Sequence, residues 1–209
     1  MGSAYLVSLS LRHFDILVVG GGEVALRKVV GLTEAPGSLT VVAPEVRREL
    51  AEFVEELGSK ASIQMRSFDP SDLAGRQAVF AATSDAKLNS EISKLCRAGG
   101  LLVNNVSDPA ESTFTNVAVA KKGELSIGVS TGSRAPGFSK AISRLIEEML
   151  PAEIGSLLVL AAEVRSQAVN SGRSAGALNW ERVLDSEVLE FIRAGKMLEA
   201  QESLSECLS

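Results

Sequence analysis

Near the start of the chain a continuous run of hydrophobic residues is followed by hydrophobic residues at helical spacing. Residues 14–19 are almost continuously apolar, which is typical of a strand buried on both faces of a parallel sheet. Directly after them Ala25, Val29 and Leu32 recur at the spacing of one helix face, and a Pro-Gly pair at 36–37 ends the pattern. The sequence therefore predicts a buried strand followed by an amphipathic helix.

The same alternation continues to residue 106. It predicts further strands over 39–43, 62–68, 78–82 and 101–106, helices over 47–57 and 88–97 between them, and a short extra strand over 5–11. Strands that alternate with helices need crossover connections, which produce a parallel, right-handed, doubly wound sheet. The fold class predicted for residues 1–112 is therefore α/β.

The pattern changes after residue 108. Two strands joined by a turn are expected within 113–130, and a stripe of apolar residues over 138–149 predicts a helix. The pattern of the remaining chain is entirely helical, apart from a loop over 170–179. We therefore expect two further parts, a small α+β region over 113–150 and a C-terminal helical domain over 151–209.

The composition narrows the class of protein. The 209 residues are 45% hydrophobic and 22% charged, as in a globular protein with a sizeable core, and the net charge of −5 argues against nucleic acid as a partner. Because no long apolar run and no leader is recognisable, we expect no membrane span and a cytoplasmic location. The single histidine and two distant cysteines argue against a metal site, and Cys96 is expected to be a packed thiol.

A glycine motif follows the first buried strand. Gly20-Gly21-Gly22-Glu23-Val24-Ala25 matches G-x-G-x-x-A between a strand and an amphipathic helix, which is the context of the dinucleotide fingerprint. Gly20 permits the tight turn, Gly22 lets a pyrophosphate approach the backbone, and Ala25 allows close packing of helix and strand. The motif therefore predicts a Rossmann-type domain that binds NAD, and the alternative is a glycine-rich turn without a ligand.

The residues after the strand over 39–43, which would bind the adenine ribose, match the dinucleotide fingerprint less well. Ala43 stands where an acidic residue often binds the ribose, while Pro44 and Glu45 follow it, so Glu45 could substitute. Arg47 and Arg48 come next, and their spacing would also allow them to bind the 2′-phosphate of NADP. Because Glu45 can take the place of the usual acidic residue, the sequence favours NAD over NADP.

Polar residues follow two later strands of the predicted sheet. Thr83 follows the strand over 78–82 and is placed to line the nicotinamide side of the pocket, while Asn89 either lines it too or braces its helix. Asp108 follows the strand over 101–106, at the same edge of the sheet as the glycine loop. Its carboxylate is either a proton acceptor beside the nicotinamide or the first residue of an Asp-Pro turn.

The segment over 129–136 offers groups that suit an anion. Ser130, Thr131 and Arg134 provide hydroxyls and a guanidinium beside backbone N–H groups. Residues 112–150 hold five lysines and arginines against three glutamates, opposite in sign to the whole chain. An acidic small molecule would suit this segment, and a solvated mixed surface is the alternative.

Taken in order, these motifs resemble the precorrin-2 dehydrogenase family, the sirohydrochlorin-forming module of siroheme synthases. The stretches that carry the resemblance lie over 16–28, 39–45, 68–73, 81–89, 105–108 and 129–136. The resemblance implies an NAD-dependent oxidoreductase of siroheme and porphyrin biosynthesis. It would oxidise precorrin-2, an acidic tetrapyrrole, to sirohydrochlorin as a homodimer joined through residues 113–150.

The resemblance also implies roles for individual residues. The catalytic aspartate of the family falls on Asp108, as general base and proton shuttle. Cofactor contacts fall on Gly22, Glu23, Val24, Pro44, Glu45 and Thr83, and the candidates for substrate binding are Asn105, Ser130, Thr131 and Arg134. One departure is that the residues after Phe114 lack the proline that is common in the family.

Other functions stay open at this level. An NAD-binding regulatory module without turnover would carry the same glycine loop and use Asp108 only for structure. A dehydrogenase of another small acid is disfavoured, because no histidine follows the first strand and the only tyrosine is Tyr5. The sequence is compatible both with an enzyme that only dehydrogenates and with one that also inserts iron or cobalt into the tetrapyrrole.

Overall fold

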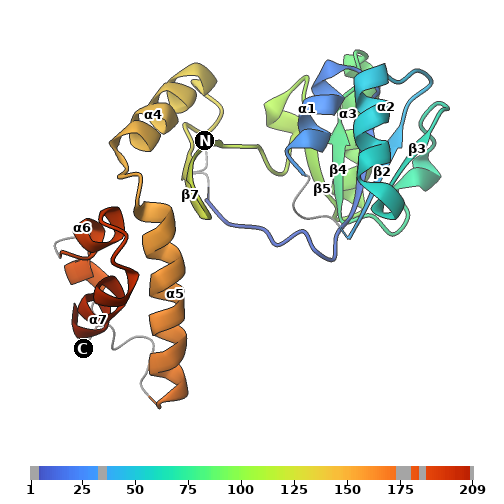
Figure 1. Cartoon of the computed structure of the whole chain (residues 1–209). Helices are drawn as coiled ribbons and strands as arrows, with labels where there is room; N and C mark the ends of the chain where they lie inside the picture. The colour runs from blue at the N-terminus through green and yellow to red at the C-terminus, as the bar shows by residue number, and fades with distance from the viewer. Residues whose placement is uncertain (1–4, 33–36, 173–179, 184–186, 208–209) are drawn as a thin grey trace. The chain divides into compact units, whose positions relative to one another are not determined.

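The computed structural model describes residues 5–32, 37–172, 180–183 and 187–207 (Figure 1). The chain divides into two compact units, one over 7–116 and one formed mainly by the residues from 117 onward. Each unit has its own hydrophobic core. The predicted boundaries at residues 112 and 150 remain predictions.

The first unit is built on a parallel sheet of five strands. The strands are β1 (Asp15–Val19), β2 (Ser38–Val42), β3 (Ala61–Gln64), β4 (Ala78–Ala81) and β5 (Leu102–Asn105), in the order β3-β2-β1-β4-β5. Val19, at the end of β1, lies opposite Val42 on β2 and Ala81 on β4. The order reverses at β1, so the ends of β1 and β4 flank a topological switch point.

Helices cover both faces of this sheet (Figure 1). α1 (Glu23–Val30) and α2 (Arg48–Glu56) pack on one face against Ile16 and Val18, and α3 (Ala86–Ala98) packs on the other against Leu17 and Val19. Ile16 to Val19 point alternately to opposite faces and are 0–2% exposed, which is why this part of β1 is continuously apolar. The predicted α/β doubly wound fold is confirmed.

The second unit combines a hairpin with helices. β6 (Ala118–Lys122) pairs antiparallel with β7 (Leu125–Val129), and α4 (Pro136–Met149) packs against the hairpin. The helices that follow are α5 (Ile154–Asn170), the 3₁₀ turn η5 (Trp180–Val183), α6 (Val188–Arg193) and α7 (Met197–Cys207). Within the described parts of the chain, no helix is long and apolar enough to cross a membrane.

Two predicted strands need correction. The stretch over 5–11 is not a strand, and Tyr5 and Val7 are 89% and 58% exposed, because no neighbouring strand supplies the hydrogen bonds that its alternation would need. The strand predicted over 62–68 ends at Gln64, since the Arg66 N–H turns back onto the Gln64 carbonyl. The loop predicted over 170–179 falls largely on 173–179, outside the described residues.

Candidate functional site

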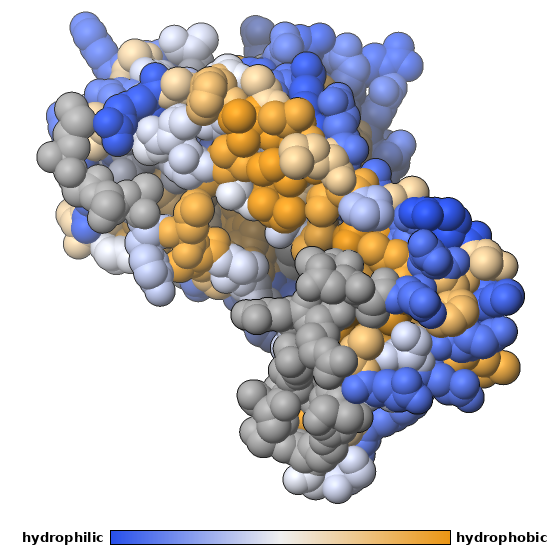
Figure 2. All heavy atoms as spheres, turned by 90° about the vertical axis from the view of Figure 1, so that its left-hand side faces the viewer, coloured by the Kyte–Doolittle hydropathy of each residue, from blue (hydrophilic) through white to orange (hydrophobic). Residues whose placement is uncertain are grey.

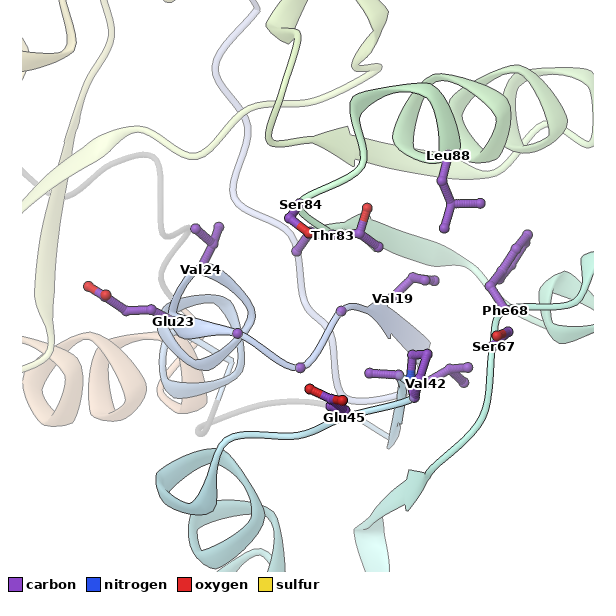
Figure 3. A pocket seen from close by; sticks show the side chains of 16 residues that line it. Val19, Glu23, Val24, Val42, Glu45, Ser67, Phe68, Thr83, Ser84 and Leu88 are labelled. Carbon is purple, nitrogen blue, oxygen red and sulfur yellow. The ribbon is translucent and has the colours of Figure 1, made fainter.

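A pocket of about 530 Å³ opens at the carboxyl ends of β1, β2 and β4 (Figure 3). It lies at the switch point of the sheet, where open α/β sheets bind their ligands. The residues that line it lie at the ends of strands, in the loops that follow them and at the starts of α1 and α3, and they are Val19, Gly20, Gly21, Gly22, Glu23, Val24, Val42, Ala43, Pro44, Glu45, Ser67, Phe68, Ala82, Thr83, Ser84 and Leu88. Seven of the eight predicted cofactor residues are therefore brought together here.

The three glycines of the loop have different surroundings. Gly20 has φ of +131°, and a Cβ there would lie 2.3 Å from the Ala82 carbonyl oxygen. A Cβ on Gly21 would lie 2.0 Å from the carbonyl oxygen of Glu45. A Cβ on Gly22 would meet nothing within 4 Å. Packing within the protein therefore accounts for the first two glycines, whereas Gly22 borders open space in which a ligand could approach.

The N-terminus of α1 faces this space. Gly22 is the N-cap and has no side chain to satisfy the first turn, and the first helical bond runs from the Leu26 N–H to the Gly22 carbonyl. The N–H groups ahead of Leu26 have no helical carbonyl to meet, and they carry the positive end of the helix dipole. Ala25, the eighth predicted cofactor residue, is fully buried against the sheet. This arrangement suits a pyrophosphate.

Glu45 lies on one side of the glycine loop, and Thr83 and Ser84 lie on the other (Figure 3). Beyond Glu45, Arg47 forms ion pairs with Glu23 at 3.7 Å and with Glu49 at 3.3 Å, and the bond from Arg47 lowers the pKa of Glu49. Two carboxylates therefore already face the guanidinium that could receive a 2′-phosphate.

The loop after β3 carries Ser67 and Phe68 into the pocket. An ion pair closes this loop, because Arg66 Nη1 donates to Asp72 Oδ2 at 2.8 Å and Arg66 Nη2 donates to Asp72 Oδ1 at 2.5 Å. Asp72 Oδ2 also accepts the Asp69 N–H at 2.9 Å. The hydrogen bonds from Arg66 hold the pKa of Asp72 below its usual value.

Asn89 joins the ends of β4 and β5. It is fully buried, its Oδ1 accepts the Thr83 hydroxyl at 2.7 Å, and its Nδ2 donates to the Thr83 carbonyl at 3.0 Å and to Ser107 Oγ at 2.7 Å. Asn89 does not line the pocket, and its side chain braces these two loops rather than its own helix. Thr83, which lines the pocket, is thereby tied to the residue that precedes Asp108.

Asp108 lies in the loop after β5 and is exposed. Its Oδ1 accepts the Ala110 N–H at 2.9 Å and so caps the 3₁₀ turn η3 (Pro109–Glu111). Asn105 is only 2% exposed, and its side chain bonds to the backbone of this loop and to Glu111. Neither Asp108 nor Asn105 lines the pocket at the carboxyl ends of β1, β2 and β4.

The other predicted substrate residues belong to the second unit. Ser130 Oγ accepts the Gly132 N–H at 3.1 Å, and Thr131 Oγ1 accepts the Ala135 N–H at 3.1 Å. Arg134 is exposed in the turn before α4. The structure therefore gathers these three residues in one loop, separate in the chain from the dinucleotide pocket.

Side-chain contacts hold the segment of Phe114 and Asn116, in which the expected proline is absent. The Phe114 ring packs edge-on against Phe80 with centroids 5.4 Å apart, and Lys28 Nζ donates to Asn116 Oδ1 at 2.8 Å. The same ammonium lies 5.6 Å from the centroid of the Phe80 ring. Burial, with a smaller effect from Arg27, lowers the pKa of Lys28. These contacts hold the segment against α1 and β4.

Sequence reasoning missed several pocket residues. Ser67 and Phe68 had been assigned to the end of a strand, and Ser84 and Leu88 had no assigned role, although all four line the pocket. Their position after β3 and β4 is the signal that could have found them, because strand ends beside a switch point form the binding crevice. Among the described residues, no cluster of three or more His, Cys, Asp or Glu is placed to hold a metal ion.

The glycine loop, the sheet order and the pocket together define a dinucleotide-binding Rossmann domain. A family model described as putative NAD(P)-binding matches residues 7–118, and the chain belongs to this family. The predicted cofactor is therefore confirmed at the level of the family.

The wider comparisons extend along nearly the whole chain. It is 37% identical over 201 residues to a siroheme synthase of Ectopseudomonas mendocina, covering 95% of this chain and 43% of the relative. It is 35% identical over 208 residues to a siroheme synthase of Methylobacillus flagellatus, covering 97% of this chain and 44% of the relative. The chain thus spans less than half the length of these relatives, and its resemblance to the siroheme synthase module is confirmed.

A solved structure titled SirC, precorrin-2 dehydrogenase, has the same fold. The TM-score is 0.75 at 24% sequence identity, and the match covers 97% of this chain and all of the other. The likeness therefore includes the C-terminal unit as well as the Rossmann domain.

Proposed function

We propose that this protein catalyses the NAD-dependent dehydrogenation of precorrin-2 to sirohydrochlorin in siroheme biosynthesis. The main observation behind this proposal is that the side chain of Asn89 hydrogen-bonds both to the pocket residue Thr83 and to Ser107 in the loop of Asp108. A dinucleotide pocket and a candidate base are thus joined by the hydrogen bonds of the fully buried Asn89 side chain. The names of the siroheme synthase relatives and of the SirC structure support the choice of substrate.

The cofactor residues divide the pocket by chemistry. The backbone at Gly20 and Gly22 and the N–H groups at Glu23 and Val24 would hold the pyrophosphate, with Ala25 packed beneath them. Pro44 and Glu45 would meet the adenine ribose, and Thr83 would face the nicotinamide. NAD, when bound, supplies a hydride acceptor. Glu45 favours NAD, because its carboxylate can accept from a ribose hydroxyl and would repel a 2′-phosphate.

Asp108 would act as the general base. Dehydrogenation removes a hydride and a proton from the substrate, and the carboxylate of Asp108 would take the proton. The loop that carries Asp108 is fixed at Ser107 by Asn89 and at η3 by the Asp108 cap itself.

The substrate carries several carboxylates, which need cationic and N–H partners. Ser130, Thr131 and Arg134 would serve this purpose from the loop before α4. Asn105 is too deeply buried for that task, and its side chain instead holds the loop of Asp108.

We also propose that a homodimer forms through residues 113–150 and that the protein works in the cytoplasm. Val119, Phe138, Leu145 and Met149 of this region are 42%, 62%, 50% and 74% exposed. Figure 2 shows apolar side chains gathered on the face of the molecule that it draws. A second copy would cover such side chains, and analytical ultracentrifugation would measure a mass of two chains.

A regulatory module that binds NAD without turnover is the second candidate. The observation that favours it is the bond from the Ala110 N–H to Asp108 Oδ1, since a cap of η3 is a structural role that needs no chemistry. On this alternative, Asp108 would matter only for the shape of the loop.

Anaerobic incubation with precorrin-2 and NAD, followed by absorbance, tests the proposal. We expect sirohydrochlorin to form, and a folded protein that binds NAD but forms none would overturn the assignment. Addition of Fe(II) or Co(II) afterwards tests whether the same chain inserts a metal.

Two variants distinguish the two roles of Asp108, general base and cap of η3. Asp108→Asn keeps a side-chain oxygen that can accept the Ala110 N–H but lacks a base, and Asp108→Ala lacks both. If Asp108 is the base, both variants bind NAD and neither turns over. If Asp108→Asn turns over like the wild type, the residue acts as a cap and not as the base.

A further inference from the structure

A single side-chain oxygen fixes the backbone that enters Asp108. Asn105, the last residue of β5, accepts two backbone N–H groups at its Oδ1, from Ser107 at 2.9 Å and from Asp108 at 3.2 Å. Because Asn105 is 2% exposed, water does not compete freely for these bonds. The direction in which the loop leaves the sheet therefore depends on which end of the Asn105 amide faces it.

Glu111 determines that orientation. Asn105 Nδ2 donates to Glu111 Oε2 at 2.9 Å, and the other carboxylate oxygen, Oε1, accepts the Ser90 hydroxyl of α3 at 2.8 Å. If the amide were reversed, its NH₂ group would face the two backbone donors, and its oxygen would face a carboxylate. The acceptor oxygen of Glu111 therefore selects the orientation in which Asn105 holds the loop.

Further bonds close the loop around this pair. The Glu111 N–H donates to the Asp108 carbonyl at 3.1 Å, and Ser112 Oγ accepts the Asn105 N–H at 2.8 Å. Glu111 itself is half-buried and is neither part of the dinucleotide pocket nor a residue that the comparisons assign. Its carboxylate ties Asn105, which holds the Asp108 loop, to Ser90 of α3.

We infer that Glu111 is a positioning residue, which acts through Asn105 to orient the backbone of Asp108 for proton removal. This inference rests on the proposed function for its effect on turnover. It does not rest on that function for its effect on the loop, because the Ser107 and Asp108 amides report the bond to Asn105 directly.

The donors and acceptors allow a rescue experiment. Glu111→Gln can still accept from Asn105, while its amide donates to Ser90 Oγ, which is able to act as an acceptor. Glu111→Ala removes the partner of Asn105. Asn105→Asp sets one carboxylate against another, and adding Glu111→Gln to it restores a donor between the two side chains.

The readouts are kcat and KM for precorrin-2, the Kd of NAD by calorimetry, and hydrogen exchange of the Ser107 and Asp108 amides. Glu111→Ala and Asn105→Asp should lower kcat by roughly tenfold to a hundredfold, with the Kd of NAD unchanged. Both amides should exchange faster. Glu111→Gln should behave like the wild type, and the double variant should regain kcat and protection relative to Asn105→Asp.

Glu91→Ala is the matched control, because Glu91 is an exposed glutamate next to Ser90 on α3. The inference is overturned if Glu111→Ala keeps the kcat and amide protection of the wild type, or if the double variant is no better than Asn105→Asp. Should the wild type itself fail to oxidise precorrin-2, the proposed function fails, and the exchange of the two amides still decides whether Glu111 sets the loop.

Discussion

The backbone N–H of Arg47 donates a 2.8 Å hydrogen bond to the carbonyl of Gly21, which joins the start of α2 to the glycine loop. The same close approach leaves no room for a side chain at Gly21, whose Cβ would lie 2.0 Å from the Glu45 carbonyl oxygen. Gly22, one residue further, borders open space. Neighbouring glycines of one motif therefore have different roles. Gly21 allows two loops to pack closely, and Gly22 leaves space for a ligand.

Alanine substitutions should separate these roles. Gly21→Ala forces backbone apart and should destabilise the fold by about 1–3 kcal/mol, as overpacking does. Gly22→Ala should change stability by less than about 1 kcal/mol. It should nevertheless weaken NAD binding at least about tenfold, or ~1.4 kcal/mol, because its methyl group would enter the space for the pyrophosphate. Urea unfolding and calorimetry measure the two effects.

Gly137→Ala provides the control, since a Cβ at that position of α4 meets nothing within 4 Å. It should leave the affinity for NAD unchanged. Wild-type affinity in Gly22→Ala would show that the pyrophosphate does not approach the backbone at Gly22.

Glu45 should decide between the two dinucleotides. It lines the pocket, and the guanidinium of Arg47 is shared between Glu23 and Glu49. Glu45→Ala should therefore lower the preference for NAD over NADP about tenfold, as expected for the loss of a hydrogen bond to a charged acceptor. The ratio of the two Kd values measures this preference.

Arg47→Ala is the companion variant. The guanidinium of Arg47 already faces Glu23 and Glu49, which would repel a 2′-phosphate. We expect NADP to bind Arg47→Ala as weakly as the wild type. A Glu45→Ala protein with an unaltered ratio would place the adenine ribose away from Glu45.

The apolar pattern predicted the sheet because burial on both faces leaves a local trace in each strand. Ile16 to Val19 are 0–2% exposed, and the sequence shows them as a continuous apolar run. The alternation over 5–11 looks equally suitable for a strand, but a strand also needs a neighbour to pair with. That neighbour is a property of the fold and leaves no trace in the segment itself.

The same distinction separates the parts of the candidate site. The glycine loop could be predicted because the tight turn and the open helix end are local requirements. The role of Asn89 could not, since it depends on Ser107, eighteen positions away. Glu111 also escaped notice, because its partner Ser90 lies on another element. Residues that orient others are found by their contacts and not by their spacing.

The two cysteines should differ sharply in reactivity. Cys96 is fully buried between α3 and the sheet, and burial raises the pKa of its thiol to about 11. Cys207 is half-buried near the end of α7. Since the thiolate is the reactive form, iodoacetamide at pH 8 should label Cys207 in the native protein and Cys96 only in denaturant. Peptide mass spectrometry measures both, and equal labelling under native conditions would mean that α3 opens.

The pair of Arg66 and Asp72 should make the pocket loop sensitive to acid. The Asp72 side chain is 8% exposed, and the hydrogen bonds from Arg66 lower its pKa below the ordinary 3.8. A carboxyl group with a lowered pKa in the folded state stabilises the fold above its ordinary pKa. That stabilisation is lost as the pH falls through the lower, folded value.

Asp72→Asn tests this dependence. The variant should be less stable than the wild type at pH 7 and should bind NAD more weakly, because Ser67 and Phe68 lie in the loop that the pair closes. Urea unfolding at a series of pH values should show the difference in stability shrinking below pH 3.8. Asp85→Asn is the control, since Asn also caps helices well and Asp85 caps α3 through the Lys87 and Leu88 N–H groups. A stability difference for Asp72→Asn that stays constant down to acid pH would mean that the charge of Asp72 does not hold the loop.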